Sequence, residues 1–161
     1  MLGYKNVIQG DASERKTWDE LVSLMNRNTN KMKFDHIIMN PPYCRNLHLK
    51  ILNEAIHHSD DIVNLSPIRW LQDPLAEYKR NSDWKKFENI RNHIESIEII
   101  SAKDACAVFG ALFNTDLGIY HITKFGGFDC TKVINVNMRL VKMSANCRFP
   151  NLKPYCESDT H

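Results

Sequence analysis

The chain has 161 residues, of which 43% are hydrophobic and 25% are charged, a balance typical of one soluble globular domain with its own core. A formal net charge of +2 and a pI near 8.3 exclude a strongly basic surface, so contact with nucleic acid must depend on local clusters of Lys and Arg. No apolar run approaches the roughly 18 residues of a membrane span, and we expect no membrane partner.

The cysteines are five in number and widely spaced. They include no CxxC pair that would indicate zinc, and no secretory signal peptide is visible. We therefore expect reduced thiols, a cytoplasmic protein and no metal. The five positions are Cys44, Cys106, Cys130, Cys147 and Cys156.

Short apolar runs and helical periodicities alternate along the first part of the chain. Residues 6–9 predict a strand that ends at Gly10 and Asp11, and residues 12–26 predict an amphipathic helix. Residues 34–39 form an apolar run without alternation, which predicts a strand buried on both faces of a parallel sheet. Residues 47–57 then place their apolar side chains on one helical stripe.

The alternation continues after residue 60. Strands are predicted at residues 61–65, 96–101 and 117–123, a charged amphipathic helix at residues 84–94, and a strand or hairpin at residues 133–143. Strands that alternate with helices of this length indicate an α/β fold with a mostly parallel sheet and flanking helices.

The run FDHIIMNPPYCRN, from residue 34 to residue 46, ends its apolar half in Asn40, Pro41, Pro42 and Tyr43. Open α/β sheets bind ligands at the carboxyl ends of their strands, where this tetrad is expected. An amide, a prolyl carbonyl and a flat ring suit a planar molecule with an exocyclic amine, such as a nucleobase. The alternative is a plain turn in which Asn40 caps the strand and the prolines stiffen the loop.

This stretch resembles the catalytic motif of the S-adenosylmethionine-dependent amino-methyltransferases, notably the N6-adenine DNA methyltransferases of restriction-modification systems. The similarity extends over roughly residues 5–124, with a specific centre and looser flanks. VIQGD at residues 7–11, DIVNLSPIRWL at residues 61–71 and CAVFGALFNTDLGIYHITK at residues 106–124 follow the family's order.

The resemblance implies a Rossmann-like methyltransferase fold, S-adenosylmethionine as cofactor and DNA as substrate. It implies that Asp11, together with Asn40, lies on the cofactor side of the site. It further implies that an aromatic side chain packs against the extruded base, with Phe109 as the first candidate and Phe113 as the second.

The chemistry of such a site follows from the amine, whose lone pair is delocalised into the adenine ring. Acceptors on Asn40 and on the Pro41 carbonyl would orient the two N–H bonds and free that lone pair, so catalysis is mostly orientation and electrostatics. Pro42 stiffens the loop, and Tyr43 would stack on the base through its ring. A base inside a duplex must be flipped out to reach the pocket.

The sequence departs from the family in the cofactor motif. The family's glycine-rich FxGxG turn would lie before Val7, where only MLGYKN is found, and Gly126 and Gly127 have neither the preceding register nor a third glycine. We therefore expect a fold that is incomplete on its N-terminal side, with a partial catalytic domain at residues 1–145 and a loosely ordered tail at residues 146–161. A second polypeptide would supply the cofactor-binding half.

Three other features have two interpretations each. His57 and His58 beside Asp60 and Asp61 favour a helix-end role over a metal site. Cys44 favours a bystander thiol over a nucleophile. The basic residues around Trp84 fit a solvated helix face and a DNA-facing surface equally well; they are Lys79, Arg80, Lys85 and Lys86.

Two alternatives to the adenine-specific enzyme stay open at this point. One is a methyltransferase of the same motif class that acts on RNA guanine or on a protein glutamine. The other is a non-catalytic nucleic-acid-binding remnant that has kept the base pocket.

Overall fold

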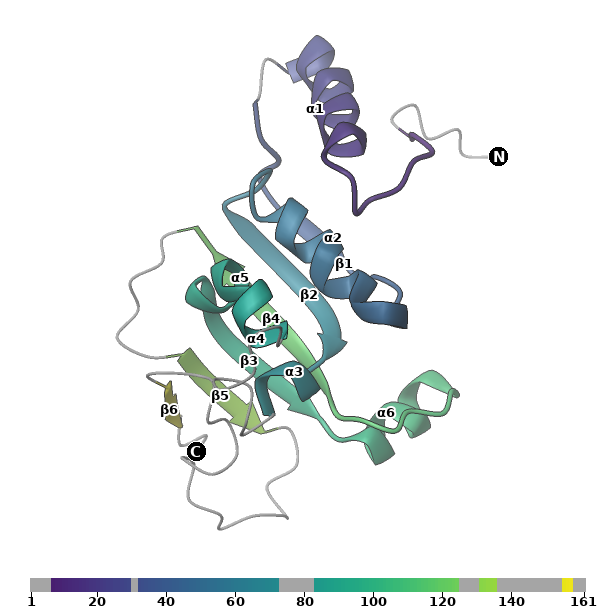
Figure 1. Cartoon of the computed structure of the whole chain (residues 1–161), viewed down its shortest axis with the longest axis vertical. Helices are drawn as coiled ribbons and strands as arrows, with labels where there is room; N and C mark the ends of the chain where they lie inside the picture. The colour runs from purple at the N-terminus through teal and green to yellow at the C-terminus, as the bar shows by residue number, and fades with distance from the viewer. Residues whose placement is uncertain (1–6, 30–31, 73–82, 125–130, 136–154, 158–161) are drawn as a thin grey trace.

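The computed structural model describes residues 7–29, 32–72, 83–124, 131–135 and 155–157. These residues form one six-stranded sheet in the order β1-β2-β4-β3-β5-β6, with helices against it (Figure 1). The strands are β1 (Ile37–Met39), β2 (Asp61–Pro67), β3 (Ile94–Ile100), β4 (Leu117–Thr123), β5 (Thr131–Asn135) and β6 (Tyr155–Glu157).

The sheet is mixed. β1 pairs with β2 in parallel, and β3, β5 and β6 also pair in parallel. β4 lies between β2 and β3 and is antiparallel to both. The α/β class is therefore confirmed. The sheet is less parallel than predicted, because β4 pairs antiparallel with both of its neighbours.

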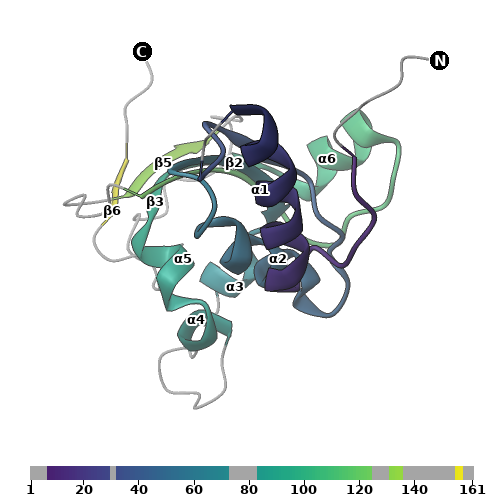
Figure 2. The ribbon, with the colours of Figure 1, turned by 90° about the horizontal axis from the view of Figure 1, so that it is seen from above.

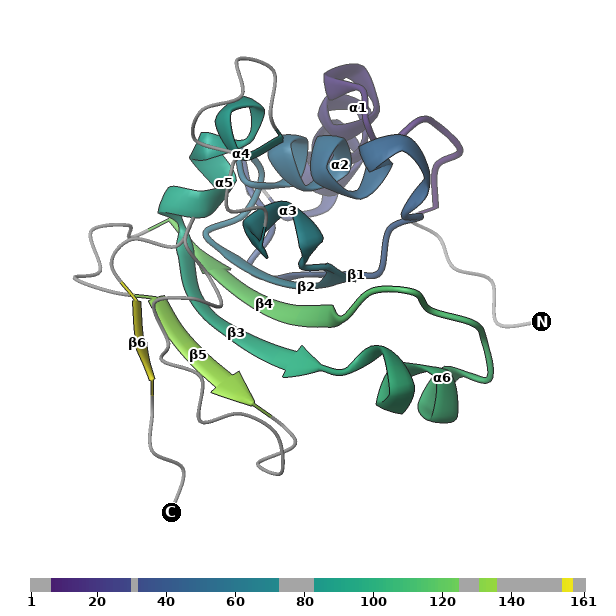
Figure 3. The same ribbon diagram turned by 60° about the horizontal axis from the view of Figure 1, so that its bottom comes forward.

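The helices lie mainly on one face of the sheet. Figures 2 and 3 show α1 to α5 on the same side, while α6 extends beyond the end of β3. The helices are α1 (Arg15–Thr29), α2 (Leu47–Ala55), α3 (Arg69–Gln72), α4 (Asp83–Lys86), α5 (Glu88–Asn92) and α6 (Ala102–Phe109), with a 3₁₀ turn η1 (Cys44–Asn46) before α2.

The core lies between this helical layer and the sheet. Leu52 of α2, Ile62 of β2, Ile97 of β3 and Tyr120 of β4 are fully buried there. Along β2, buried and more accessible residues alternate, as expected for a strand with one covered face. The helix-covered face thus supplies the apolar burial, and within the described residues no helix packs on the other face.

The prediction that residues 34–39 are buried on both faces is wrong. Only Ile37–Met39 form β1, and the side chain of Ile38 is 84% exposed. β1 is the edge strand, and Ile38 is paired in register with Val63 on the face that carries no described helix. An apolar run reports hydrophobicity but not whether a second layer is present to cover it.

Two further predictions need correction. Residues 7–9 form no strand, because the chain turns at Asp11 and enters α1, and Asn6 lies outside the described residues. The helix predicted at residues 84–94 is interrupted at buried Phe87, whose φ of −116° and ψ of 35° are not helical. Because Phe87 and Ile90 are both buried, the chain is bent to bring them into the core.

The other predicted elements are confirmed with small shifts in their bounds, as α1, α2, β2, β3 and β4. Residues 133–135 of the predicted strand or hairpin belong to β5, and residues 136–143 lie outside the described part. Of the tail expected to be loosely ordered, Tyr155–Glu157 instead form β6 against β5. None of the described helices has the length and apolar character needed to cross a bilayer.

Candidate functional site

The carboxyl ends of β1, β2 and β3 meet at one edge of the sheet, since both β2 and β3 run opposite to β4. At this edge lies a pocket of about 290 Å³. Its lining residues are Asn40, Pro41, Pro42, Tyr43, Leu65, Phe109 and Phe113. The loop after β1, the end of β2, and α6 with the loop behind it therefore form its walls.

The pocket brings together residues that are far apart in the sequence. The Asn40–Tyr43 tetrad follows β1, whereas Phe109 ends α6 and Phe113 lies in the loop that leads to β4. All four tetrad residues and both aromatic candidates named from the sequence line it. Leu65 was not anticipated, although its place in the strand next to β1 is the signal that could have indicated it.

The loop that carries the tetrad is stiff and strained. Pro41 is buried, and two consecutive non-glycine residues after the tetrad, Arg45 and Asn46, have φ of 48° and 61°. A left-handed conformation costs a residue such as arginine about 1–2 kcal/mol, whereas asparagine adopts it more readily. Such strain clusters at functional sites. Asn46 Nδ2 donates to Asp83 Oδ2 at 2.8 Å, which helps to hold the second of them.

The Tyr43 hydroxyl links the tetrad to itself and to the end of β2. Its hydroxyl donates to Asn40 Oδ1 at 2.8 Å and lies 3.5 Å from the carbonyl oxygen of Leu65. Burial raises the pKa of the Tyr43 hydroxyl, so the phenol keeps its proton at neutral pH and stays a donor. The Asn40 side chain is exposed, and the second lone pair of its oxygen is available to a ligand.

Three aromatic contacts surround the pocket. The Tyr43 and Phe113 rings have centroids 6.5 Å apart at 50°, and Phe109 meets Phe113 edge-on at 5.9 Å. Behind Tyr43, the His48 ring stands edge-on at 5.9 Å. The rings of Tyr43, Phe109 and Phe113 line the pocket and give it flat apolar walls of the kind that suit a planar ligand.

His48 was not identified from the sequence as part of this site. It lies buried in the first turn of α2, and its Nδ1 is without a hydrogen-bond partner. Burial lowers its pKa, while a hydrogen bond with the Tyr43 backbone acts in the opposite direction. A neutral imidazole therefore supports the tetrad from behind.

The aromatic wall is braced through α6. Ser101 caps this helix by accepting from the Asp104 backbone N–H at 3.2 Å, and Ala102 N donates to Asp116 Oδ1 at 2.9 Å. The Phe113 backbone N–H donates to Cys106 Sγ at 3.2 Å. The loop is thus tied to the helix both at its base and beside Phe113, which fixes the ring that faces Tyr43.

Asp11 lies apart from this pocket. Its Oδ1 accepts from the backbone N–H of Ser13 at 2.8 Å and from its hydroxyl at 2.7 Å, and these bonds lower its pKa. Asp11 is exposed and is not a lining residue. In this arrangement it stabilises the turn before α1.

The histidines and aspartates around residue 60 point in separate directions. His58 is buried and stacks on Trp18 at 5.4 Å, whereas His57 is exposed. Asp60 accepts from Lys33 at 2.8 Å. In the described part of the chain, no three His, Cys, Asp or Glu side chains are grouped so that they could hold a metal ion.

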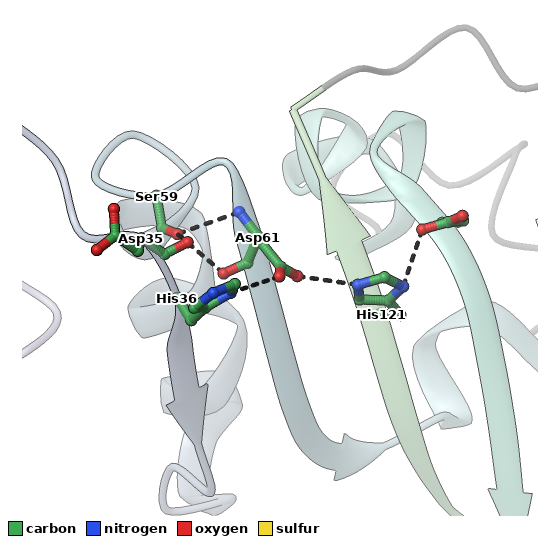
Figure 4. Close-up of polar contacts among 6 residues, drawn as sticks. Asp35, His36, Ser59, Asp61 and His121 are labelled. Atoms are coloured by element: carbon green, nitrogen blue, oxygen red, sulfur yellow. Dashed lines mark hydrogen bonds and ion pairs between the residues drawn. The ribbon is translucent and has the colours of Figure 1, made fainter.

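Asp61 instead belongs to a polar chain at the edge of the sheet opposite the pocket (Figure 4). Its two carboxylate oxygens lie 2.6 Å from His36 Nδ1 and 2.9 Å from His121 Nε2. The other ring nitrogen of His121 lies 2.8 Å from Glu95 Oε2. His121 therefore bridges the carboxylates of Asp61 and Glu95 through its two ring nitrogens.

Of the basic cluster around Trp84, Lys85 and Lys86 lie exposed on α4, while Lys79 and Arg80 are outside the described residues. Cys44 is an exposed free thiol.

Comparisons of the chain with protein-family models, with curated proteins and with solved structures gave no match.

Proposed function

We propose that this chain is the base-binding part of an adenine-N6 DNA methyltransferase, which transfers a methyl group from S-adenosylmethionine to the exocyclic amine of a flipped-out adenine. One observation carries the proposal. The polar tetrad and both aromatic residues expected to hold an adenine line a single pocket at the carboxyl edge of the sheet.

The pocket offers the contacts that an adenine requires. Asn40 Oδ1 and the Pro41 carbonyl are acceptors for the two N–H bonds of the amine, and they draw its nitrogen toward tetrahedral geometry. Tyr43 and Phe113 present ring faces and edges to the base. The strained backbone of Arg45 and Asn46 fits a loop whose geometry is set by function and not by its own preference.

The cofactor side is a separate matter. S-adenosylmethionine supplies an electrophilic methyl group when it is bound, but Asp11, the residue expected to hold it, lies outside the pocket with its carboxylate engaged by Ser13. The described residues therefore do not fit a cofactor site. We propose that a second polypeptide provides it, and we expect isothermal titration of this chain alone to give weak or no S-adenosylmethionine binding.

A nucleic-acid-binding protein without methyl transfer is the second candidate, and the position of Asp11 favours it. The two candidates share the base pocket and differ in the reaction. Incubation of the chain with S-adenosylmethionine and DNA, with and without a co-purifying polypeptide, followed by mass spectrometry of the nucleosides, separates them. Formation of N6-methyladenine only in the presence of the second polypeptide would support the methyltransferase over the binding protein.

The base pocket itself can be tested without the reaction. Fluorescence anisotropy would compare short single strands that carry one adenine or, at the same position, one purine, which has the same rings but no exocyclic amine. Because the purine leaves both acceptors unpaired, we expect about tenfold to a hundredfold weaker binding, the value of two hydrogen bonds. Equal affinities would contradict the proposal, and a preference for the same strand in RNA or for a glutamine peptide would redirect it.

A further inference from the structure

An apolar tip projects next to the pocket, formed by Val108, Phe109 and Leu112. Their side chains are 72%, 45% and 99% exposed. Exposure of one apolar residue is ordinary, but a cluster beside a pocket is a common sign of a binding surface. Phe109 belongs to both features, since it also lines the pocket.

The apolar tip is held in place by its surroundings. Gly110 ends α6 in a left-handed conformation with φ of 63°, which turns the chain sharply before Leu112. Cys106 Sγ then accepts from the Phe113 backbone N–H at 3.2 Å. Leu112 is therefore presented at the apex of a braced turn, and α6 extends beyond the end of the sheet (Figure 3).

The proposed base pocket beside the apolar tip favours a nucleic acid over a protein as its partner, because Phe109 both lines the pocket and belongs to the tip. Arg45, two residues after Tyr43, and Lys103, in the first turn of α6, are both exposed. Two carboxylates lie in the same region and are hydrogen-bonded at the start of α6, since Asp104 accepts from the Ser101 hydroxyl at 2.5 Å and Asp116 from the Ala102 N–H. These two exposed cations, one in the segment after the tetrad and one on α6, suit contact with a phosphate backbone.

We infer that Leu112 is a wedge that enters the base stack of a DNA duplex and fills the space left by the base that is turned into the pocket. Apolar side chains inserted between base steps unstack and kink a duplex in this way. Insertion would offset part of the unpairing cost of a flipped base. The inference rests on the proposed function, because it requires that the pocket accepts a base from DNA.

Single strands and duplexes separate the wedge from the pocket. A base in a single strand is already free, so the wedge should matter only for a duplex. We would measure binding by anisotropy, and flipping by fluorescence of 2-aminopurine placed next to a mismatched target adenine, since a mismatched base is the least costly duplex base to extrude. Leu112→Ala should weaken duplex binding and the fluorescence change by about tenfold, in the range for burial of one leucine side chain, and should leave single-strand affinity unchanged.

Met32→Ala is the matched control, since Met32 is a similarly exposed apolar residue that does not line the pocket. It should behave as wild type with both probes. If wild type binds the single strand and Leu112→Ala leaves duplex binding unchanged, Leu112 is not a wedge, and the proposal of a base-binding pocket is unaffected. If wild type binds neither probe, the proposed function fails as well. A change in self-association of Leu112→Ala, seen by sedimentation, would show that the apolar tip contacts protein instead.

Discussion

The Tyr43 hydroxyl donates a hydrogen bond to Asn40 Oδ1 at 2.8 Å. The residue proposed to stack on the base therefore also positions the amide proposed to orient the amine. An amide oxygen accepts two hydrogen bonds, so one lone pair remains for the ligand. From the sequence, Tyr43 was expected to act through its ring alone, and the structure adds a role for its hydroxyl.

Two substitutions at Tyr43 should have different effects. Tyr43→Phe keeps the flat ring but releases Asn40, so purine affinity should stay and the preference for adenine over purine should fall about threefold to tenfold, the value of one hydrogen bond. Tyr43→Ala should lose about 1–3 kcal/mol of affinity for both strands, the value of one base–aromatic stack. Equal effects of Phe and Ala, with lowered melting temperatures in both, would mean that Tyr43 only anchors the turn.

Asn40→Ala should reduce the preference for adenine over purine by about threefold to tenfold, because the Pro41 carbonyl remains as the second acceptor. The chain should stay folded, because the Asn40 side chain is exposed and has little packing to lose. Where methyl transfer is reconstituted, the rate should fall by about two to three orders of magnitude, as for other oriented polar groups in catalytic sites. Asn92→Ala, at an exposed amide at the end of α5, is the control and should leave both readouts unchanged. Near-normal turnover of Asn40→Ala would remove this residue from the mechanism.

Local patterns predicted the elements well where burial on one face imposes a period. α1, α2, β2, β3 and β4 follow from their apolar spacing. The direction of β4 did not follow, because apolar spacing is the same in either chain direction. The exposure of Ile38 and the absence of a strand at residues 7–9 depend on which layers and strands are near, and a local run carries no information on this.

The candidate site depended on long-range information to a greater extent. The meeting of Tyr43 with Phe109 and Phe113 requires the order of β1, β2, β4 and β3, and the sequence indicated it only through a family resemblance. The hydrogen bond between Tyr43 and Asn40 depends on side-chain orientation. His48 behind the tetrad shows as one polar residue on an apolar helix face, which does not distinguish a support from a surface position.

The free energy of unfolding should decrease as the pH is lowered from about 7.5 to about 5.5. Burial lowers the pKa of both His48 and His58 below the ordinary 6.5. Near pH 6.5 the unfolded chain therefore binds more protons than the folded chain. The free energy of unfolding that the neutral histidines contribute above that pH is lost as the pH falls. Each histidine contributes at most about 1.4 kcal/mol per pH unit, measured by urea unfolding.

The histidine assignment can be checked with His48→Phe and His58→Phe, which keep a ring against Tyr43 and Trp18 respectively. Each should flatten the pH dependence, and the double variant should flatten it further. An unchanged slope in the double variant would show that other groups cause the pH dependence.

Gly118 should tolerate no side chain, although it lies in a regular strand. A Cβ at this position would be 2.5 Å from Ile68 Cγ2 and 3.1 Å from Ile97 Cγ2. Ile68 is fully buried where β2 ends and α3 begins, so it has little freedom to move aside. We expect Gly118→Ala to lower the free energy of unfolding by about 1–3 kcal/mol through overpacking.

A double-variant experiment distinguishes a clash with Ile68 from a general requirement for glycine at position 118. If Ile68 is the obstacle, Gly118→Ala and Ile68→Ala should be non-additive, and the double variant should be more stable than the sum of the single changes predicts. Gly110 gives the contrast, because a Cβ there meets no atom within 4 Å but φ is +63°. Gly110→Asn should therefore be milder than Gly110→Ala, since Asn adopts the left-handed region more readily. Additivity at Gly118 and Ile68 would mean that the strand, and not the contact with Ile68, requires the glycine.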